Sequence, residues 1–590
     1  MGDLMASGTN PGSTYTISTG DPGVYHEDRV VVTEVAPSTY VTQMFRAYGA
    51  TLNATSDEWE FQSGVSTAYA TVQNPGGSIH YFTYSGTNFW QTSDWKGSDN
   101  NTVYNAVDFG TTAGGSASSN TSALSSLFTA MATATAPALE GGSAWIPQYN
   151  FPVNASAAGL TVPDQAIIQG LGTGGFNAGT QGYHFSISDA GALVPGIFWS
   201  FIGPHSSGGT YLRNLAFQWV SPGFASDTCL IFKYWSNAAE GCNFTDCPVA
   251  INFEGLAGSA VRCTVNYGAV DSTLPSNVTA FWVQGQQNAI LGPSELGGGS
   301  LEGTSACVGI GGGPATVEHN TIRGCHIYGW NYGIDFSDIN LTGIGSGTSN
   351  DVFDGNKIDC IKSCVLMQTN NTTAQIFNQT LAFNELIKSE ESTDGSPIVF
   401  IDTNGGALHN IDNISLIGNT IYSNVTSGEA QENQYGVQIG TCAAVSIIGG
   451  RISQCGTKTE AGSDGTANIC ISGSPSLVTV SAVDLNGVYP GANSGNDTGP
   501  TGSAASEYAL LISGNPKVVN VADCYMSGTS GYSVSITGNP ETVRLTNCTL
   551  STSALSVTGT PTSLIVTNCT GYSVPQKHRR EDRYELTRCA

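Results

Sequence analysis

A short repeat near the C-terminal end of the chain limits the possible folds more than any other feature of the sequence. Four segments share the pattern Ile/Val-Ser/Thr-Gly-x-Pro; they end at Pro475, Pro516, Pro540 and Pro561, so their spacings are 41, 24 and 21 residues. An alternating apolar run follows each proline, and in the last three repeats it leads to Cys524, Cys548 and Cys569. Repetition at this period indicates a solenoid, in which each coil buries its apolar side against the next. We therefore expect the three cysteines to stack as a ladder.

The middle of the chain repeats a related pattern, Asn-x-Ile/Leu, at Asn320, Asn356, Asn384 and Asn419. Short β-branched runs separated by Gly and Asn are typical of strands joined by turns, because Gly and Asn tolerate left-handed backbone conformations. Stacked strands lie about 4.8 Å apart, so equivalent side chains form ladders and like charges repel. Only 11% of the residues are charged, which agrees with such stacking. The two patterns predict an all-β parallel solenoid over residues 106–570.

The overall composition excludes several classes of partner. The 590 residues include 19 Lys and Arg against 45 Asp and Glu, a formal net charge of -26, so we expect no nucleic-acid partner. No stretch approaches the roughly 18 apolar residues of a membrane helix, and we expect no membrane insertion. The N-terminus lacks the basic and apolar regions of a secretory signal, which predicts assembly in a cytosol. The 15 cysteines fit this, since none precedes Cys229 and their number is odd; most are expected to be small buried side chains.

An ordered set of motifs lies where the solenoid should begin. Val107-Asp108-Phe109-Gly110 is followed by an Ala/Ser-rich helical stretch at 122–134, by Gly141-Gly142-Ser143-Ala144-Trp145-Ile146-Pro147, by Leu160-x-Val162-Pro163 and by Ile167-Ile168-Gln169-Gly170-Leu171-Gly172. This order resembles the start of the pectate-lyase-like right-handed parallel β-helix superfamily. The resemblance implies a right-handed parallel β-helix with an N-terminal capping helix.

The capping helix is also expected from its own residues. Leu124, Leu127, Phe128 and Met131 recur at helical spacing, and they would cover the apolar end of the first coil. The superfamily often carries acidic residues before this helix, where this chain has 114–116 Gly-Gly-Ser and 119–121 Ser-Asn-Thr. No role of those acids is carried over to this chain. Asn120 or Thr121 is expected to cap the helix.

The superfamily includes pectinolytic hydrolases and lyases as well as bacteriophage tailspikes. The pectinolytic signatures Asn-Thr-Asp, Gly-His-Gly and Arg-Ile-Lys are absent, and Arg451-Ile452 is followed by Ser453. The sequence therefore looks more like a tailspike. That resemblance implies a homotrimer in the virion, assembled in the host cytoplasm, which binds a bacterial surface polysaccharide and contacts other phage tail proteins through its N-terminal domain.

The two ends of the chain lack the repeat. Residues 1–105 are rich in aromatic side chains, and Tyr69 to Tyr84 are typical of a hairpin around Asn74-Pro75-Gly76-Gly77. We expect this segment to form a small β-rich domain that attaches to a particle or shields the end of the solenoid. Residues 571–590 hold five of the 19 basic residues, which predicts a charged C-terminal tail or cap.

Two carboxyl groups are the main requirement for glycoside hydrolysis, at about 5 Å for retention and roughly 6.5 to 9.5 Å for inversion. Aligning the coils on their Asn residues puts Glu318 and Asp354 at equivalent positions, two residues before each Asn. Stacking would raise the pKa of one carboxyl group and leave the other ionised, as acid/base catalysis requires. We therefore predict that Glu318 and Asp354 form a catalytic pair.

Aromatic residues and carboxylates are most concentrated between residues 326 and 338. Tyr328, Trp330 and Tyr332 alternate, so on a strand they would share one face, with Asp335 and Asp338 at its end as further candidate acids. An outward face would be a stacking platform for sugar rings, and an inward face would be part of the core.

The remaining polar and aromatic candidates leave more alternatives open. Glu385 aligns with Lys357, and it would either bind substrate or form a surface ion pair. Asp402 and Asp412, with His409 between them, are possible second carboxylates. Trp199, Trp219, Trp235 and Trp282 would extend a groove or fill the core. Neither Cys360-x-x-x-Cys364 nor Cys242-x-x-x-x-Cys247 has partners at zinc-site spacing, and we expect no metal and no cofactor.

Three functions remain open at this point. The first is a tailspike that binds and hydrolyses a polysaccharide as an endoglycosidase. The second is a tail adhesin that binds glycan without cleaving it. The third is a free bacterial polysaccharide lyase or hydrolase, which would need an export route. A lyase would also need a cation such as Ca²⁺, because Lys and Arg are scarce in the repeats.

Overall fold

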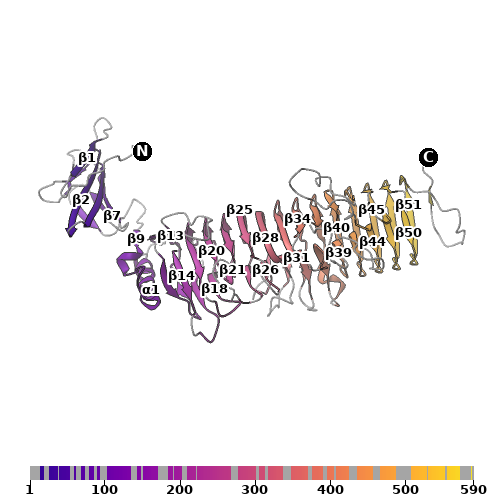
Figure 1. Ribbon diagram of the computed structural model, residues 1–590, viewed down its shortest axis with the longest axis horizontal. Helices are drawn as coiled ribbons and strands as arrows, with labels where there is room; N and C mark the ends of the chain where they lie inside the picture. Colours follow the sequence, from indigo (N-terminus) through magenta and orange to yellow (C-terminus); the bar gives the residue numbers. More distant parts are fainter. Residues whose placement is uncertain are drawn as a thin grey trace. The chain divides into compact units, whose positions relative to one another are not determined.

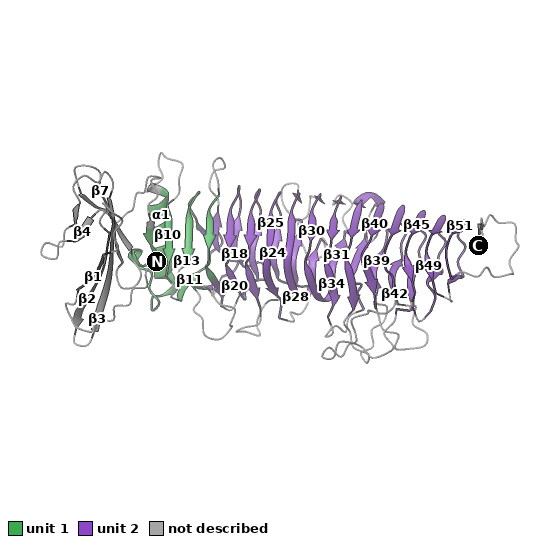
Figure 2. Cartoon of the chain, turned by 90° about the horizontal axis from the view of Figure 1, so that it is seen from above, with its two compact units in different colours: residues 1–154, 161–186, 206–216 green, residues 155–160, 187–205, 217–590 purple. Residues whose placement is uncertain are grey.

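The fold is described from a computed structural model. It covers the strands between residues 14 and 92, residues 103–571 and the strand Leu586–Thr587. Within 103–571, the segments not described are 135–141, 148–149, 171–183, 190–191, 202–208, 221, 268–274, 276, 300–303, 313–316, 337–346, 370–374, 390–394, 404, 406, 424–434, 456–465, 487–505, 528, 530 and 552–553. The chain divides into two compact units, residues 1–154, 161–186 and 206–216, and residues 155–160, 187–205 and 217–590 (Figure 2).

An antiparallel sheet forms the first part of the first unit. Its strand order is β1-β2-β3-β6-β7-β8, and a separate pair is formed by β4 and β5. The bounds are β1 (Thr14–Ser18), β2 (His26–Ala36), β3 (Thr39–Tyr48), β4 (Ala50–Leu52), β5 (Trp59–Phe61), β6 (Ala68–Gln73), β7 (Ile79–Tyr84) and β8 (Phe89–Thr92). Strands β6 and β7 pair antiparallel with Tyr69 opposite Thr83, as the predicted hairpin requires. The turn predicted at Asn74 to Gly77 lies outside the described residues.

The predicted capping helix is present as α1 (Ala117–Ala134). Leu124, Leu127, Phe128 and Met131 are all buried, as their spacing predicts. The helix begins before Ser122, and the predicted cap is wrong because the Ser116 hydroxyl, not Asn120 or Thr121, accepts a hydrogen bond from Ser119 N at 3.1 Å. The buried Asn120 amide instead donates to Thr112 O and Pro152 O, both at 3.0 Å. Asn120 therefore ties the helix to the neighbouring strand.

Parallel strands before and after the helix form the first coils. Strands β9 (Val103–Asn105), β10 (Ser143–Ile146), β13 (Ile167–Gly170) and β16 (Tyr211–Arg213) pair in parallel, in that order. The other elements of these coils are η1 (Ala106–Phe109), β11 (Phe151–Asn154), β12 (Leu160–Thr161), β14 (Phe185–Ser188) and β17 (Ala216–Trp219).

The second unit is a β-helix whose strands stack in three long parallel sheets (Figure 1). Sheet A contains β19 (Ala238–Glu240), β22 (Ser259–Val261), β30 (Val352–Asp354), β33 (Thr380–Ala382), β37 (Ile414–Ile417), β40 (Ala444–Ile448), β43 (Leu477–Ser481), β45 (Val518–Ala522), β48 (Thr542–Thr546), β51 (Ser563–Thr567) and β52 (Leu586–Thr587). Sheet B contains β20 (Asn243–Thr245), β23 (Thr264–Asn266), β34 (Glu385–Lys388), β38 (Thr420–Ser423), β41 (Arg451–Ser453) and the pair β46 (Tyr525–Met526) and β49 (Thr549–Leu550).

Sheet C completes each coil. It contains β15 (Ile197–Phe201), β18 (Thr228–Phe232), β21 (Val249–Phe253), β24 (Thr279–Val283), β26 (Ala306–Ile310), β35 (Val399–Asp402), β39 (Tyr435–Ile439), β42 (Ala467–Ile471), β44 (Tyr508–Ile512), β47 (Val534–Ile536) and β50 (Leu555–Val557). Three long strands bend through more than one sheet: β25 (Ala289–Gly297), β28 (Thr321–Asp335) and β31 (Lys357–Gln368). A short fourth sheet contains β27 (Val317–Glu318), β29 (Thr348–Ser349), β32 (Ile376–Phe377) and β36 (Ile411–Asp412), with η2 (Leu408–Asn410) before β36. The chain is a right-handed parallel β-helix, as the repeats and the resemblance predict.

Ladders of equivalent side chains fill the interior. Each of Cys524, Cys548 and Cys569 follows a residue with a left-handed φ of 52° to 55° at the corner after sheet A, so the predicted cysteine ladder is confirmed. The described cysteines are free thiols, and all but Cys569 are buried. They act as small interior side chains, as expected. No helix among the described residues is long and apolar enough to cross a membrane.

Candidate functional site

The predicted pairing of Glu318 with Asp354 is wrong. Strands β28 and β30 pair with Thr321 opposite Val352 and Arg323 opposite Asp354. Glu318 lies opposite Ser349, in the short fourth sheet. The two carboxyl groups therefore belong to different sheets of the coil and do not stack.

The error arises because asparagine ladders occur at two different corners of the coil. Asn320 belongs to one ladder, in which its N–H and its Nδ2 donate to Asp351 Oδ1 at 2.8 and 2.9 Å, and its Oδ1 accepts from Asn288 N at 2.9 Å. Asn356 belongs to the other ladder, together with Asn384 and Asn419. Because the residues of the two ladders recur at similar spacing, the sequence alone does not show that Asn320 and Asn356 lie at different corners.

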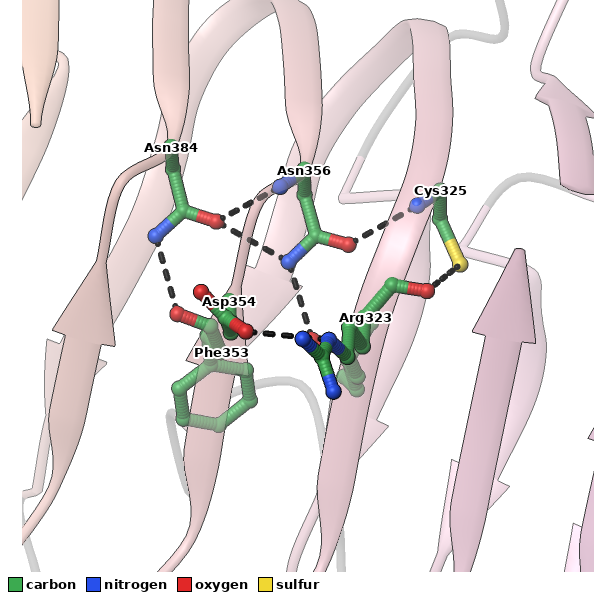
Figure 3. Close-up of polar contacts among 7 residues, drawn as sticks. Arg323, Cys325, Phe353, Asp354, Asn356 and Asn384 are labelled. Carbon is green, nitrogen blue, oxygen red and sulfur yellow. Dashed lines mark hydrogen bonds and ion pairs between the residues drawn. The ribbon is translucent and has the colours of Figure 1, made fainter. Parts of the chain in front are cut away.

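Figure 3 shows the second ladder beside Asp354. Asn356 Oδ1 accepts from Cys325 N at 3.0 Å, and Asn384 Oδ1 accepts from both Asn356 N at 3.0 Å and Asn356 Nδ2 at 2.9 Å. Asp354 lies outside the core, where its Oδ2 is 3.0 Å from Arg323 Nε. Asp354 is thus the acidic member of a surface ion pair across two coils.

The predicted aromatic platform is also wrong in part. Trp330 is fully buried, and its Nε1 donates to Leu296 O at 2.9 Å, whereas Tyr328 and Tyr332 are only half-buried. Gly329 has a φ of 69°, and the pairing of β28 with β31 shifts on both sides of Trp330. This irregularity breaks the alternation, so the three rings do not share one face.

The two acids predicted beyond this stretch do not form a surface site. Asp335 is fully buried in sheet C, where it pairs in register with Gly309 and Leu366. A side chain at that depth cannot mark the exposed end of a sugar platform. Asp338 lies outside the described residues.

Sheet B carries an outward row of charged residues that the structure brings into register. Glu295, His326, Lys357 and Glu385 lie opposite one another on successive strands, and Thr420 and Arg451 continue the row. Glu295 Oε2 is 2.8 Å from His326 Nδ1, and Glu385 Oε2 is 4.0 Å from Lys357 Nζ. The exposed fractions of these four side chains lie between 37% and 50%. The predicted ion pair between Glu385 and Lys357 is confirmed.

A second outward row on sheet B lies two residues further along each strand. It contains Tyr328, Asp359, Ile387 and Tyr422 in register. The Tyr328 ring is 4.9 Å from the His326 ring, and its pKa is raised by burial and by the charge of Glu295. The Tyr422 hydroxyl donates to Glu385 Oε1 at 2.8 Å. We call the two rows together the sheet B face, defined by Glu295, His326, Tyr328, Lys357, Asp359, Glu385 and Tyr422.

The four predicted tryptophans divide between core and surface. Trp199 and Trp219 are fully buried, whereas Trp235 is 53% exposed and Trp282 is half-buried on sheet C. Asn252 lies opposite Trp282, and Glu254 follows two residues later, directly after β21. The sequence analysis missed Glu254, since a single Glu after an apolar strand carries no motif.

Asp402, one of the two remaining predicted acids, binds a backbone N–H group. Asp402 Oδ1 accepts from Thr441 N at 2.8 Å. Burial raises the pKa of Cys442 to about 12, and the charges of Asp402 and Asp412 add to this. His409 lies in η2 and is exposed. Within the described residues, no three His, Cys, Asp or Glu side chains come together as a metal site requires.

A buried carboxyl pair in the early coils of the second unit was also missed. Asp227 is fully buried, and its two oxygens accept from Gly196 N at 2.8 Å and Phe224 N at 2.9 Å. Burial, followed by the charge and hydrogen bond of Asp189, raises the pKa of Asp227 to about 6, although the two backbone donors oppose this. Contacts between residues 38 positions apart in different coils leave no signal in the sequence.

No sequence profile of a known family matches the chain, and neither does any curated protein. The chain is similar in structure to a mutant tailspike protein of E. coli bacteriophage HK620 in complex with a pentasaccharide, at 11% identity and a TM-score of 0.49, over 82% of this chain and 81% of that one. Another structure of that tailspike with pentasaccharide matches at 11% identity and a TM-score of 0.48, over 71% and 78% of the two chains. Tailspike protein 3 of bacteriophage CBA120 matches at 12% identity and a TM-score of 0.44, over 81% of this chain and 62% of that one.

Proposed function

We propose that this protein is a bacteriophage tailspike that binds a bacterial surface polysaccharide along the sheet B face and hydrolyses it. The observation that carries the proposal is the row of Glu295, His326, Lys357 and Glu385, flanked by Tyr328 and Tyr422. Charged residues are scarce in this chain, yet here they lie in consecutive coils on one exposed surface. Such a concentration has no role in the core, and it is typical of a binding surface.

The chemistry of the face suits a carbohydrate. Carboxylates accept hydrogen bonds from sugar hydroxyls, Lys357 donates them, and the two tyrosines offer apolar ring faces with a polar edge. Because the rows run along the stack of coils, an extended polymer can contact several coils at once. Each contact is weak, and their sum gives affinity.

Hydrolysis is assigned to Asp359 and Glu385. They lie on adjacent strands and two residues apart, which places their Cα atoms about 8 Å from each other in an ideal parallel sheet. Inverting glycosidases hold their two carboxyl groups roughly 6.5 to 9.5 Å apart, and two outward side chains whose Cα atoms are spaced in this way can reach that separation. Lys357 and Tyr422 both stabilise the Glu385 carboxylate, which suits a base. Asp359 is half-buried opposite the apolar Ile387, which suits an acid.

The proposed step moves two protons. Asp359 donates its proton to the glycosidic oxygen as the bond between that oxygen and the anomeric carbon breaks. A water molecule forms the new bond to the anomeric carbon, and Glu385 takes the proton that this water loses. The products are two saccharide chains, and one of them has a new reducing end.

The test measures binding and reducing-end release on surface polysaccharides extracted from a panel of bacterial strains. We expect Asp359→Asn and Glu385→Gln to lower release by about 100-fold or more while binding persists. Glu318→Gln and Asp354→Asn are matched controls, because they remove carboxylates elsewhere on the same coils, and we expect both to release product at the wild-type rate. Binding without release by the wild-type protein would instead indicate a tail adhesin. No binding to any polysaccharide would contradict the proposal.

The assembly follows from the same proposal. We propose a homotrimer in the virion that contacts other phage tail proteins through the sheet of β1 to β8. Its mass in solution tests the first part, with three chains expected. A chain lacking residues 1–102 should still bind polysaccharide but fail to join phage particles.

A further inference from the structure

Sheet C carries a second cluster of outward side chains, separate from the sheet B face. Trp282 on β24 lies opposite Asn252 on β21. The same register, continued one residue past the strand ends, places Glu254 between Lys233 and Gln284 of the neighbouring coils. Phe281 and Val283, on either side of Trp282, are buried in the core. Trp282 therefore points outward, and it is only half-buried.

The Trp282 ring is fixed in place. Its Nε1 donates to Gly311 O at 3.1 Å, so the indole reaches across the next coil. The residue opposite Trp282 in that coil is Gly309, which has no side chain to hold the ring away from the backbone. A large aromatic ring that is fixed by this hydrogen bond and only half-buried leaves part of its surface available for stacking.

Polar groups with unused hydrogen-bonding capacity lie beside this ring. Glu254 Oε1 accepts from Asn252 Nδ2 at 3.1 Å, and Asn252 is 6% exposed. Asn252 Oδ1 has no hydrogen-bond donor among the described residues. Burial raises the pKa of Glu254, although the charge of Lys233 and the Asn252 hydrogen bond oppose this. A carboxyl group kept partly out of water gains more from a hydroxyl partner than an exposed one does.

We infer that Trp282 and Glu254 form a saccharide-binding subsite on sheet C, where a pyranose ring stacks on the indole and its hydroxyls bind Glu254 and Lys233. The combination of one flat ring, one carboxyl group, one amide and one ammonium group is typical of sites for neutral sugars. A sugar hydroxyl that reaches Asn252 Oδ1 after a small side-chain rotation would also satisfy a buried acceptor. This inference rests on the proposed function, because the ligand is taken to be a unit of the same polysaccharide.

The test is calorimetric titration of the full chain with oligosaccharides prepared by mild acid hydrolysis of the polysaccharide that the wild-type protein binds. We expect Trp282→Ala to weaken affinity by about tenfold or more, since a stacked ring contributes roughly that much. Glu254→Gln should weaken it by a smaller factor, and it provides a second variant if Trp282→Ala does not fold. Phe383→Ala is the matched control, because it removes an aromatic side chain that is 67% exposed at the edge of sheet A, and its affinity should stay at the wild-type value.

The outcomes separate this inference from the proposed function. If the wild-type protein binds and both Trp282→Ala and Glu254→Gln retain its affinity, the sheet C subsite does not exist and the proposed function stands. If the wild-type protein binds no polysaccharide, both are wrong. A loss of affinity in the two sheet C variants, with normal melting temperatures, would establish the subsite.

Discussion

Sheets A and B belong to the same coils and share the same core, yet their outward residues differ in kind. The outward positions of sheet A from β30 to β43 are mainly Thr, Ser, Ala, Val and Ile, in rows such as Val352, Thr380, Ser415, Ser446 and Thr479. The equivalent positions of sheet B carry His326, Lys357 and Glu385. The coil thus requires mainly apolar side chains inside but leaves the choice of outward side chains free. Sheet A also has an outward ion pair, Arg323 with Asp354, but the charged residues of sheet B continue over successive coils and adjoin tyrosines, which indicates a function for sheet B.

The largest expected effect concerns the interior corner that both sheets share. Asn384 is 2% exposed. Asn384→Leu removes the acceptor of Asn356 N and leaves the carbonyl of Phe353 without the donor that Asn384 Nδ2 supplies. Each unsatisfied buried group costs about 1–3 kcal/mol, so we expect a loss of about 4 kcal/mol. Hydrogen exchange of β33, β34 and β38 measures it, because a solenoid loosens locally.

The control for this prediction lies on the outside of the same coil. Thr380→Ala on sheet A should change exchange protection by less than about 0.5 kcal/mol. Equal effects of the two substitutions would show that the asparagine ladder does not hold the corner.

The second prediction asks whether only sheet B binds glycan. Lys357→Met keeps the apolar stem but removes the charge that faces Glu385, and we expect it to weaken polysaccharide binding by about tenfold. Ser415→Lys places a charge on sheet A instead, and binding should not change. Calorimetric titration of both variants checks this, and a stronger effect of Ser415→Lys would reverse the roles of the two sheets.

The third prediction concerns carboxyl groups that lie inside the coil. Because the pKa of Asp227 is raised to about 6, the folded state binds the carboxyl proton of Asp227 more tightly than the unfolded state does. The contribution of this group to stability is therefore greatest below about pH 4 and is lost as the pH rises to 6. Asp189→Asn removes the like charge and supplies a donor, so it should raise stability by about 1 kcal/mol at pH 8.

The same variant should have a smaller effect at pH 4, where Asp227 of the wild-type protein is protonated and does not repel Asp189. Thermal melting of wild type and Asp189→Asn across this pH range gives the difference directly. A constant difference at all pH values would show that the pair does not share a proton.

The smallest effect is expected for the ion pair on the outside of sheet A. Arg323 is 68% exposed on its side chain, so its pairing with Asp354 is screened by water. We expect Arg323→Ala to cost about 0.5 kcal/mol and to leave binding unchanged. A loss of binding would extend the glycan surface onto sheet A.

The comparison also explains what the sequence could predict. The repeat period, the cysteine ladder and the buried face of α1 follow from local patterns, because each residue contacts an equivalent residue in the next coil. The pairing of Glu318 with Asp354 could not be judged from spacing, since Asn320 and Asn356 occupy different corners.

Contacts between outward side chains depend on local backbone conformation and on loop lengths, which the repeat period does not specify. A single left-handed residue, Gly329, turns Trp330 into the core and leaves Tyr328 outside. The pairing of Asp227 with Asp189 and the position of Glu254 beside Trp282 arise from side chains of different coils without any shared motif. Loops of variable length separate these coils, so the register of acidic residues is known only from the structure.

The central claim is that a polysaccharide lies on sheet B and not on sheet A. Hydroxyl-radical footprinting with bound polysaccharide tests it directly, because both sheets carry oxidisable rings. We expect protection of Tyr328 and Tyr422 on sheet B, while Phe383, which is 67% exposed at the edge of sheet A, reacts as in the free protein. Protection of Phe383 with unchanged reactivity of the two tyrosines would contradict the account.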